Sequence, residues 1–161
     1  MKNIKIEVKW AIIFILTSLT WMALEKALGW HDEKIADHAT YTNIFAAPAI
    51  AIYVFALLDK KKSFYHGRMT YKNGFLTGLI ISFIVTLFSP ITQFITSTLI
   101  TPDYFSNVIE YAVNSGIMTQ PDAEAYFNMK SYMVQSVIGA AIMGIITSAV
   151  VALFTQSRST S

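Results

Sequence analysis

Apolar residues along this chain gather in four long stretches that are separated by short polar segments. The stretches cover about residues 10–28, 41–58, 74–100 and 132–154. Each is near or above the roughly 20 residues that an α-helix needs to cross a hydrocarbon core of about 30 Å. The third is about 40 Å long at 1.5 Å per residue, so it must tilt, bend or project beyond the core. The pattern predicts an all-α membrane protein, a bundle of four transmembrane helices forming one domain over residues 1–161.

The polar segment between the third and fourth stretches predicts a short extracytoplasmic helical hairpin. A first helix is expected from Asp103 to Ser115, ended by Gly116. Thr119 then fits an N-cap, and Pro121 suits the first turn of a second helix.

Composition agrees with a membrane protein and excludes several kinds of chemistry. Hydrophobic residues make up 54% of the chain, charged residues only 14%, and the mean hydropathy is +0.48. There is no cysteine, which excludes disulfides, thiol catalysis and iron–sulfur ligation. His-Glu-x-x-His, Gly-x-Ser-x-Gly, Gly-x-Gly-x-x-Gly and P-loop patterns are also absent. We therefore expect neither an enzyme nor a cofactor.

The distribution of charge predicts the orientation. Nine basic and two acidic residues fall on the two termini and the segment after the second stretch, whereas the other segments hold three basic and eight acidic residues. Basic residues in short loops stay in the cytoplasm, so both termini are predicted there. A signal peptide is the alternative for the first stretch, but Glu25 and Lys26 interrupt the approach to a cleavage site. Anionic lipid headgroups are the expected partners of the basic cluster Lys60, Lys61 and Lys62, and nucleic acid is not.

Five polar residues of the third stretch follow one another in steps of 4, 3, 4 and 3, so they share one helical face. The face continues to a Gly-x-x-x-Gly pair, Gly74 and Gly78. Such a stripe is typical of close helix packing, and the alternative is a surface that lines a path for water or a solute. The stripe consists of Ser82, Thr86, Ser89, Gln93 and Thr96.

Other features near this stripe bear on both interpretations. Pro48 and Pro90 each remove an intrahelical hydrogen bond and predict kinks in the second and third spans. Glu25 is a carboxylate near the outer end of the first span, where it lies in the headgroup layer or handles a proton or cation. The fourth span offers a small-residue face that suits the stripe or a homodimer, formed by Ser136, Gly139, Ala140, Met143, Gly144 and Thr147.

The segment between the first two spans gathers two histidines and three carboxylates within residues 30–38. If it is helical, His31 and His38 lie two turns apart on one face. Both are candidate ligands for zinc or another divalent ion, although metal sites need three or four converging ligands. A solvated acidic turn explains the same residues.

Several short phrases resemble a bacterial membrane family catalogued as a domain of unknown function and numbered four-one-nine-nine. They are 28-LGWHDE-33, 38-HATYTN-43, 89-SPITQ-93, 100-ITPDYF-105 and 123-AEAYF-127. The similarity extends from Trp10 to about Phe154. It implies a small helical protein of the bacterial cytoplasmic (inner) membrane, and it brings no activity, substrate or catalytic residue with it.

These observations lead to two functional hypotheses. The first is a non-enzymatic accessory or interaction subunit, which associates with itself or with another membrane protein and whose polar faces are structural. The second is a small solute or ion carrier or channel that uses Ser89, Gln93 and Glu25 along a path past the two prolines. An intramembrane enzyme comes third.

Overall fold

The computed structural model describes residues 4–157 and is helical throughout, with no strand among those residues. Lys2 and Arg158, which we counted among the basic residues above, lie outside this range. The elements in chain order are α1 (Lys5–Ala27), α2 (Ile35–Tyr41), the 3₁₀ segment η1 (Thr42–Phe45), α3 (Ala46–Ser63), α4 (Tyr71–Ile95), the π-helical segment η2 (Thr96–Ile100), α5 (Tyr104–Asn114), α6 (Gln120–Tyr126) and α7 (Met129–Thr155).

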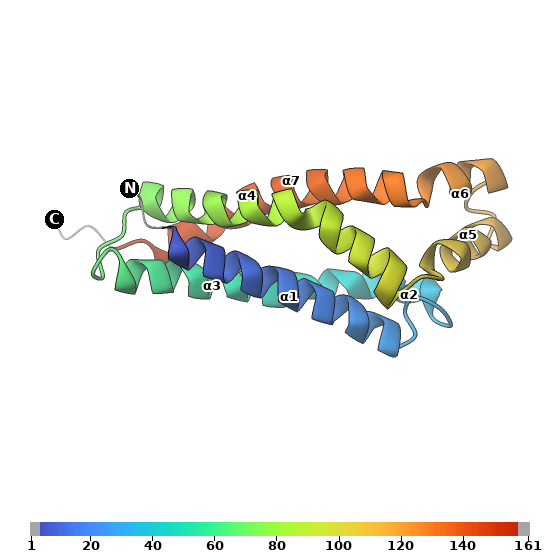
Figure 1. Cartoon of the computed structure of the whole chain (residues 1–161), viewed down its shortest axis with the longest axis horizontal. Helices are drawn as coiled ribbons and strands as arrows, with labels where there is room; N and C mark the ends of the chain where they lie inside the picture. Colours follow the sequence, from blue (N-terminus) through green and yellow to red (C-terminus); the bar gives the residue numbers. More distant parts are fainter. Residues whose placement is uncertain (1–3, 158–161) are drawn as a thin grey trace.

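The four long helices α1, α3, α4 and α7 run side by side along the long axis of the molecule (Figure 1). The ends of the described chain, Ile4 and Ser157, lie together at what we name the terminal end. The short helices α2, α5 and α6 lie at the opposite end, which we name the capped end. The short helix ends follow the sequence signals, because Thr119 caps α6 with its side chain and Gly116 adopts a φ of 68° after α5.

Four helical segments are long and apolar enough to cross a membrane, as in a multi-pass membrane protein. They are residues 5–27, 35–63, 71–100 and 129–155. The second begins earlier than expected, because α2 and η1 extend α3 toward the capped end. Large apolar side chains on these helices are exposed, including Phe83 at 69% and Phe154 at 83%. Such surfaces suit a lipid environment, since a soluble monomer rarely exposes apolar patches of this extent.

The closest helix packing is the seam between α4 and α7, and it explains the glycines of both helices. A Cβ atom added to Gly78 would lie 2.6 Å from the Cβ of Ser148, and one added to Gly144 would lie 2.6 Å from the Cβ of Ser82. Glycine therefore lets the two backbones approach, as small residues do in membrane helices. Gly139, which we placed on the same face of α7, has open space around it instead.

Polar atoms in the seam are hydrogen-bonded within it. The Ser82 hydroxyl lies 2.8 Å from the Tyr53 hydroxyl of α3 and 3.2 Å from the Ser148 hydroxyl of α7. Ser82 and Ser148 also donate to the carbonyls of Gly78 and Gly144, respectively. This part of the polar stripe thus joins three helices.

The two prolines occupy different places in their helices. Pro48 stands in the first turn of α3, directly after the 3₁₀ segment η1. Its ring conflicts with the carbonyl four residues earlier, which is a physical reason for the change of helix type there. Pro90 lies inside α4, whose ribbon bends in its second half (Figure 1). A proline inside a helix is a common cause of such a bend.

The terminal end contains a buried ion pair. Lys60 Nζ lies 2.9 Å from one carboxylate oxygen of Glu7 and 3.1 Å from the other, with both residues under 5% exposed. Lys61 donates to the carbonyls of Thr155 and Gln156 at the end of α7. Two of the three lysines that we expected at lipid headgroups therefore have partners inside the protein, and Lys62 is exposed.

Candidate metal centre

Glu25 is the most enclosed carboxylate at the capped end. Its side chain is 0% exposed and it lies two residues before the end of α1. The C-terminal end of a helix carries partial negative charge, which disfavours a carboxylate there. Nearby positive charge or hydrogen-bond donors therefore stabilise the Glu25 carboxylate. Oε1 accepts a 2.6 Å hydrogen bond from Trp21 Nε1, one turn earlier, and Thr42 also hydrogen-bonds this carboxylate.

A glycine turn brings His31 back to this carboxylate. After α1, the Gly29 amide donates to the Lys26 carbonyl and the Trp30 amide donates to the Glu25 carbonyl. This is the Schellman arrangement, in which the residue after the C-cap adopts left-handed backbone angles, and Gly29 has a φ of 77°. His31 follows at 1% exposure, with Nε2 3.1 Å from Glu25 Oε2.

His38 reaches the same oxygen from α2. Its Nε2 lies 3.3 Å from Glu25 Oε2, and its ring centre lies 4.8 Å from that of His31. The two histidines do not share a helical face, because His31 lies in the turn before α2. The condition of one helix through both residues is therefore not met, although the two rings lie side by side. Asp32, Glu33 and Asp37 are exposed and do not join the cluster.

Glu25, His31 and His38 together form the candidate site. One ligating atom from each lies within 4.8 Å of the others. His31 Nδ1 is buried and has no hydrogen-bond partner among the described residues, whereas His38 Nε2 is buried with the Glu25 carboxylate 3.3 Å away as its one polar neighbour among them. Two imidazole nitrogens facing one buried carboxylate need a proton or a cation between them, so an ion bound by His31 Nε2, His38 Nε2 and Glu25 Oε2 would stabilise the arrangement.

Tyr104 of α5 closes the site from the far side. Its hydroxyl lies 3.2 Å from His38 Nδ1 and 3.4 Å from the Tyr132 hydroxyl of α7, and its ring lies within 5.3 Å of both imidazoles. Burial, with the nearby Glu25 charge, raises the pKa of Tyr104, so the phenol stays protonated. When Tyr104 donates to Tyr132, its oxygen is free to accept the His38 Nδ1 proton, which leaves His38 Nε2 as a bare lone pair.

A further contact fixes the turn that carries His31. The Asn107 side chain donates a 3.0 Å hydrogen bond to the His31 carbonyl. Helices α1, α2, α5 and α7 thus all contribute to one site, through residues that extend from Trp21 to Tyr132.

The residue types and distances suit a divalent transition metal ion. Zinc is bound by imidazole nitrogen and carboxylate oxygen at about 2.0–2.2 Å, and two ligands of a tetrahedral ion then lie about 3.3 Å apart. The separations of 3.1 and 3.3 Å between Glu25 Oε2 and the two imidazoles are near this spacing, and all three ligating atoms lie within 4.8 Å of one another. Trp21 on the other carboxylate oxygen and Tyr104 on the outer nitrogen of His38 are the kind of partners that orient metal ligands.

The other residues that we singled out do not join this site. Ser82 lies in the seam between α4 and α7, and Ser89 donates to the Thr86 carbonyl within α4. Gln93 donates to the Ser97 hydroxyl one turn later, and Thr96 is buried at the start of η2. None of these side chains, nor Pro48 or Pro90, is among the candidate ligands.

Sequence reasoning missed Trp21, Thr42, Tyr104, Asn107 and Tyr132. Trp21 fits an interfacial position equally well, and no spacing connects Tyr104 with His38, which lies 66 residues earlier. The available signal was that Thr42 and Tyr104 each stand in one of the phrases that carry the family resemblance.

Four membrane-length helices and a polar centre enclosed at one end define a small helical multi-pass membrane protein. Comparison with known proteins identifies its family. Residues 9–157 match the family described as "Protein of unknown function (DUF4199)", and the chain belongs to this family. No curated protein and no solved structure matches the chain.

Proposed function

We propose that this protein is a non-enzymatic accessory subunit that binds one divalent transition metal ion, with zinc as the best fit, at Glu25, His31 and His38. The observation that carries the proposal is the convergence of three ligating atoms within 4.8 Å, in which two imidazole nitrogens face the same oxygen of the buried Glu25 carboxylate. Mixed imidazole and carboxylate ligands suit zinc better than calcium or magnesium, which prefer oxygen alone.

The proposed placement is a bacterial cytoplasmic membrane, with both termini in the cytoplasm and the metal centre on the other side. It is supported by the basic residues of the terminal end and by the acidic residues of the short helices. The site would then take up its metal ion from outside the cytoplasm.

The proposed role of the ion is to hold the capped end together. Its ligands come from α1, from the turn after it and from α2, while Tyr104 connects α5. Glu25 and His31 are at most 1% exposed, so a substrate has no direct access to the ion in this arrangement. Enclosure favours a structural ion over a catalytic one, and the hydrogen-bonded seam of α4 and α7 favours an accessory role over carriage of a solute.

Zinc titration of the purified protein in detergent tests metal binding. The wild type should bind one Zn²⁺ and gain thermal stability that a chelator removes, because binding to the folded state raises its stability. His31→Asn and His38→Asn should each abolish this gain. His66→Asn is the matched control, since His66 is exposed at the terminal end and its φ of 49° is one that asparagine tolerates. Equal zinc binding by all three variants would contradict the proposal.

Hydrogen exchange tests the structural role of the ion separately. Zinc should slow exchange of the amides in α2 and α5, because both helices are connected to the ligands. Stoichiometric zinc binding that leaves hydrogen exchange in both helices unchanged would support the metal site. It would refute the proposed role of the ion in holding the capped end together.

A further inference from the structure

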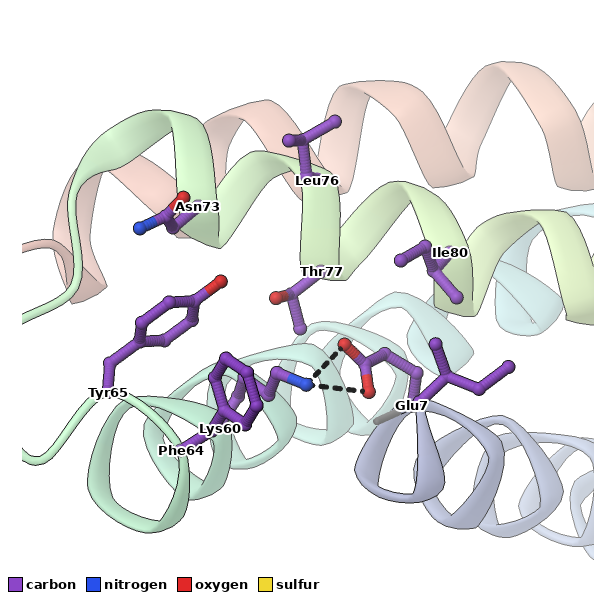
Figure 2. A pocket seen from close by; sticks show the side chains of 9 residues that line it. Glu7, Lys60, Phe64, Tyr65, Asn73, Leu76, Thr77 and Ile80 are labelled. Atoms are coloured by element: carbon purple, nitrogen blue, oxygen red, sulfur yellow. Dashed lines mark hydrogen bonds and ion pairs between the residues drawn. The ribbon is translucent and has the colours of Figure 1, made fainter. Parts of the chain in front are cut away.

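A second feature, at the terminal end, is independent of the metal centre. A cavity of about 270 Å³ lies between the first turn of α1, the end of α3 and the start of α4 (Figure 2). This is far larger than one water molecule and just below the roughly 300 Å³ at which pockets for drug-sized ligands begin. Its lining includes the polar residues Glu7, Lys60, Tyr65 and Thr77.

The cavity contains hydroxyl groups with unused hydrogen-bonding capacity. Thr77 is only 2% exposed, yet its hydroxyl makes no hydrogen bond within the described part of the chain, and the same holds for the Tyr65 hydroxyl. Both hydroxyls point into the cavity (Figure 2). Burial and the charge of Glu7 raise the pKa of Tyr65, so its phenol is a neutral donor. A ligand with acceptor oxygens would satisfy both groups.

The Glu7–Lys60 ion pair gives the cavity one negative and one positive group. The Lys60 ammonium bonds both oxygens of the carboxylate and lies 4.2 Å from the centre of the Phe64 ring. A carboxylate has about four acceptor positions, and Lys60 occupies two of those of Glu7. Glu7 can therefore accept a further hydrogen bond from a cationic group of a ligand. The Tyr65 and Thr77 hydroxyls can donate hydrogen bonds to an anionic group of the same ligand.

The rim of the cavity is apolar and faces outward. Ile4, Phe64 and Leu76 are 44%, 40% and 37% exposed, respectively. Leu76 and Ile80 belong to the apolar segment of α4 that is long enough to cross a membrane. The polar groups thus lie where a membrane helix leaves the hydrocarbon layer, and the apolar rim lies where acyl chains begin. A ligand with a polar head and an apolar tail matches both parts.

We propose that this cavity binds the headgroup of a zwitterionic phospholipid that carries a primary amine, namely phosphatidylethanolamine. The phosphate oxygens accept hydrogen bonds from Tyr65 and Thr77, and the ammonium group donates to Glu7. The balanced charge of Glu7 and Lys60 favours a headgroup with both charges over a purely anionic one. The basic residues Lys62, Arg68 and Lys72 are exposed outside the cavity, where anionic lipids meet them without entering it.

Phosphatidylcholine is the sharpest comparison, because its trimethylated amine has the same charge but no N–H donor. Titration of the purified protein with each lipid, followed by native mass spectrometry, gives the two dissociation constants. We expect phosphatidylethanolamine to bind roughly 10- to 100-fold more tightly, which is the effect of one hydrogen bond between charged groups. Equal binding of the two lipids, or tighter binding of phosphatidylglycerol than of phosphatidylethanolamine, would overturn the proposal.

The variant Tyr65→Phe/Thr77→Val removes both hydroxyl donors with little change in volume. It should lose most of the binding of phosphatidylethanolamine. Tyr71→Phe/Thr20→Val makes the same chemical changes outside the cavity and should retain it. An unchanged melting temperature in phosphatidylcholine shows that each variant is folded. A folded Tyr65→Phe/Thr77→Val variant that binds phosphatidylethanolamine as the wild type does would exclude this cavity as the lipid site.

Discussion

Gly78→Ala tests the packing of α4 against α7 at its closest point. The added Cβ would lie 2.6 Å from both the Cβ and the Oγ of Ser148, whereas carbon atoms in favourable contact are about 3.5–4.0 Å apart. The helices must therefore separate by about 1 Å, since the Cβ of Ser148 is fixed to the backbone and cannot rotate away. Overpacking of this kind costs about 1–3 kcal/mol of the free energy of unfolding. Reversible unfolding in mixed detergent and SDS micelles measures that free energy.

Two further variants decide whether this reasoning is correct. Gly139→Ala introduces the same methyl group into α7 where no atom lies within 4 Å, so it should be neutral or stabilising by up to about 1 kcal/mol. Gly78→Ala/Ser148→Gly removes the opposing Cβ and should recover most of the loss. Equal stability of Gly78→Ala and Gly139→Ala would refute the close seam.

Three more predictions concern single contacts. Lys60→Met should destabilise the protein by about 3–5 kcal/mol, because it leaves the buried Glu7 carboxylate unpaired, and Glu7→Gln/Lys60→Met should recover much of this in the same unfolding assay. Gly29→Ala should cost about 1–2 kcal/mol through its φ of 77° alone, since no atom lies within 4 Å of the added Cβ; a neutral result in thermal unfolding would argue against the left-handed turn. Tyr104→Phe should weaken zinc binding about 10- to 100-fold with the fold retained, as loss of a hydrogen bond to a ligating histidine does, and calorimetry that finds wild-type affinity would remove Tyr104 from the site.

Local periodicity predicted those parts of the structure that depend on neighbouring residues. Four apolar stretches of sufficient length gave four long helices, because a helix in lipid must satisfy its own backbone. Thr119 is the N-cap of α6, because its side chain accepts a hydrogen bond from the nearby Asp122 amide. The steps of 4 and 3 along α4 placed Ser82 in the seam, but its partners Tyr53 and Ser148 follow from the tertiary packing.

The proposed metal centre could be predicted only in its components. His31 and His38 were candidate metal ligands and Glu25 was a separate polar candidate, but their convergence depends on the left-handed turn at Gly29, which places His31 beside Glu25. Tyr104 is 66 residues from His38, so no helical spacing relates the two. The ion pair of Glu7 and Lys60 joins residues 53 positions apart, so helical spacing does not predict it either. Lys60 also stands among three consecutive lysines, which indicated only a basic cluster.

X-ray absorption at the zinc edge of the zinc-loaded protein tests the central claim most directly. The account predicts two imidazole ligands and at least one oxygen ligand at about 2.0–2.2 Å, with one imidazole lost in His31→Asn and another in His38→Asn. A spectrum without imidazole scattering, or one that neither substitution changes, would contradict a metal centre at Glu25, His31 and His38.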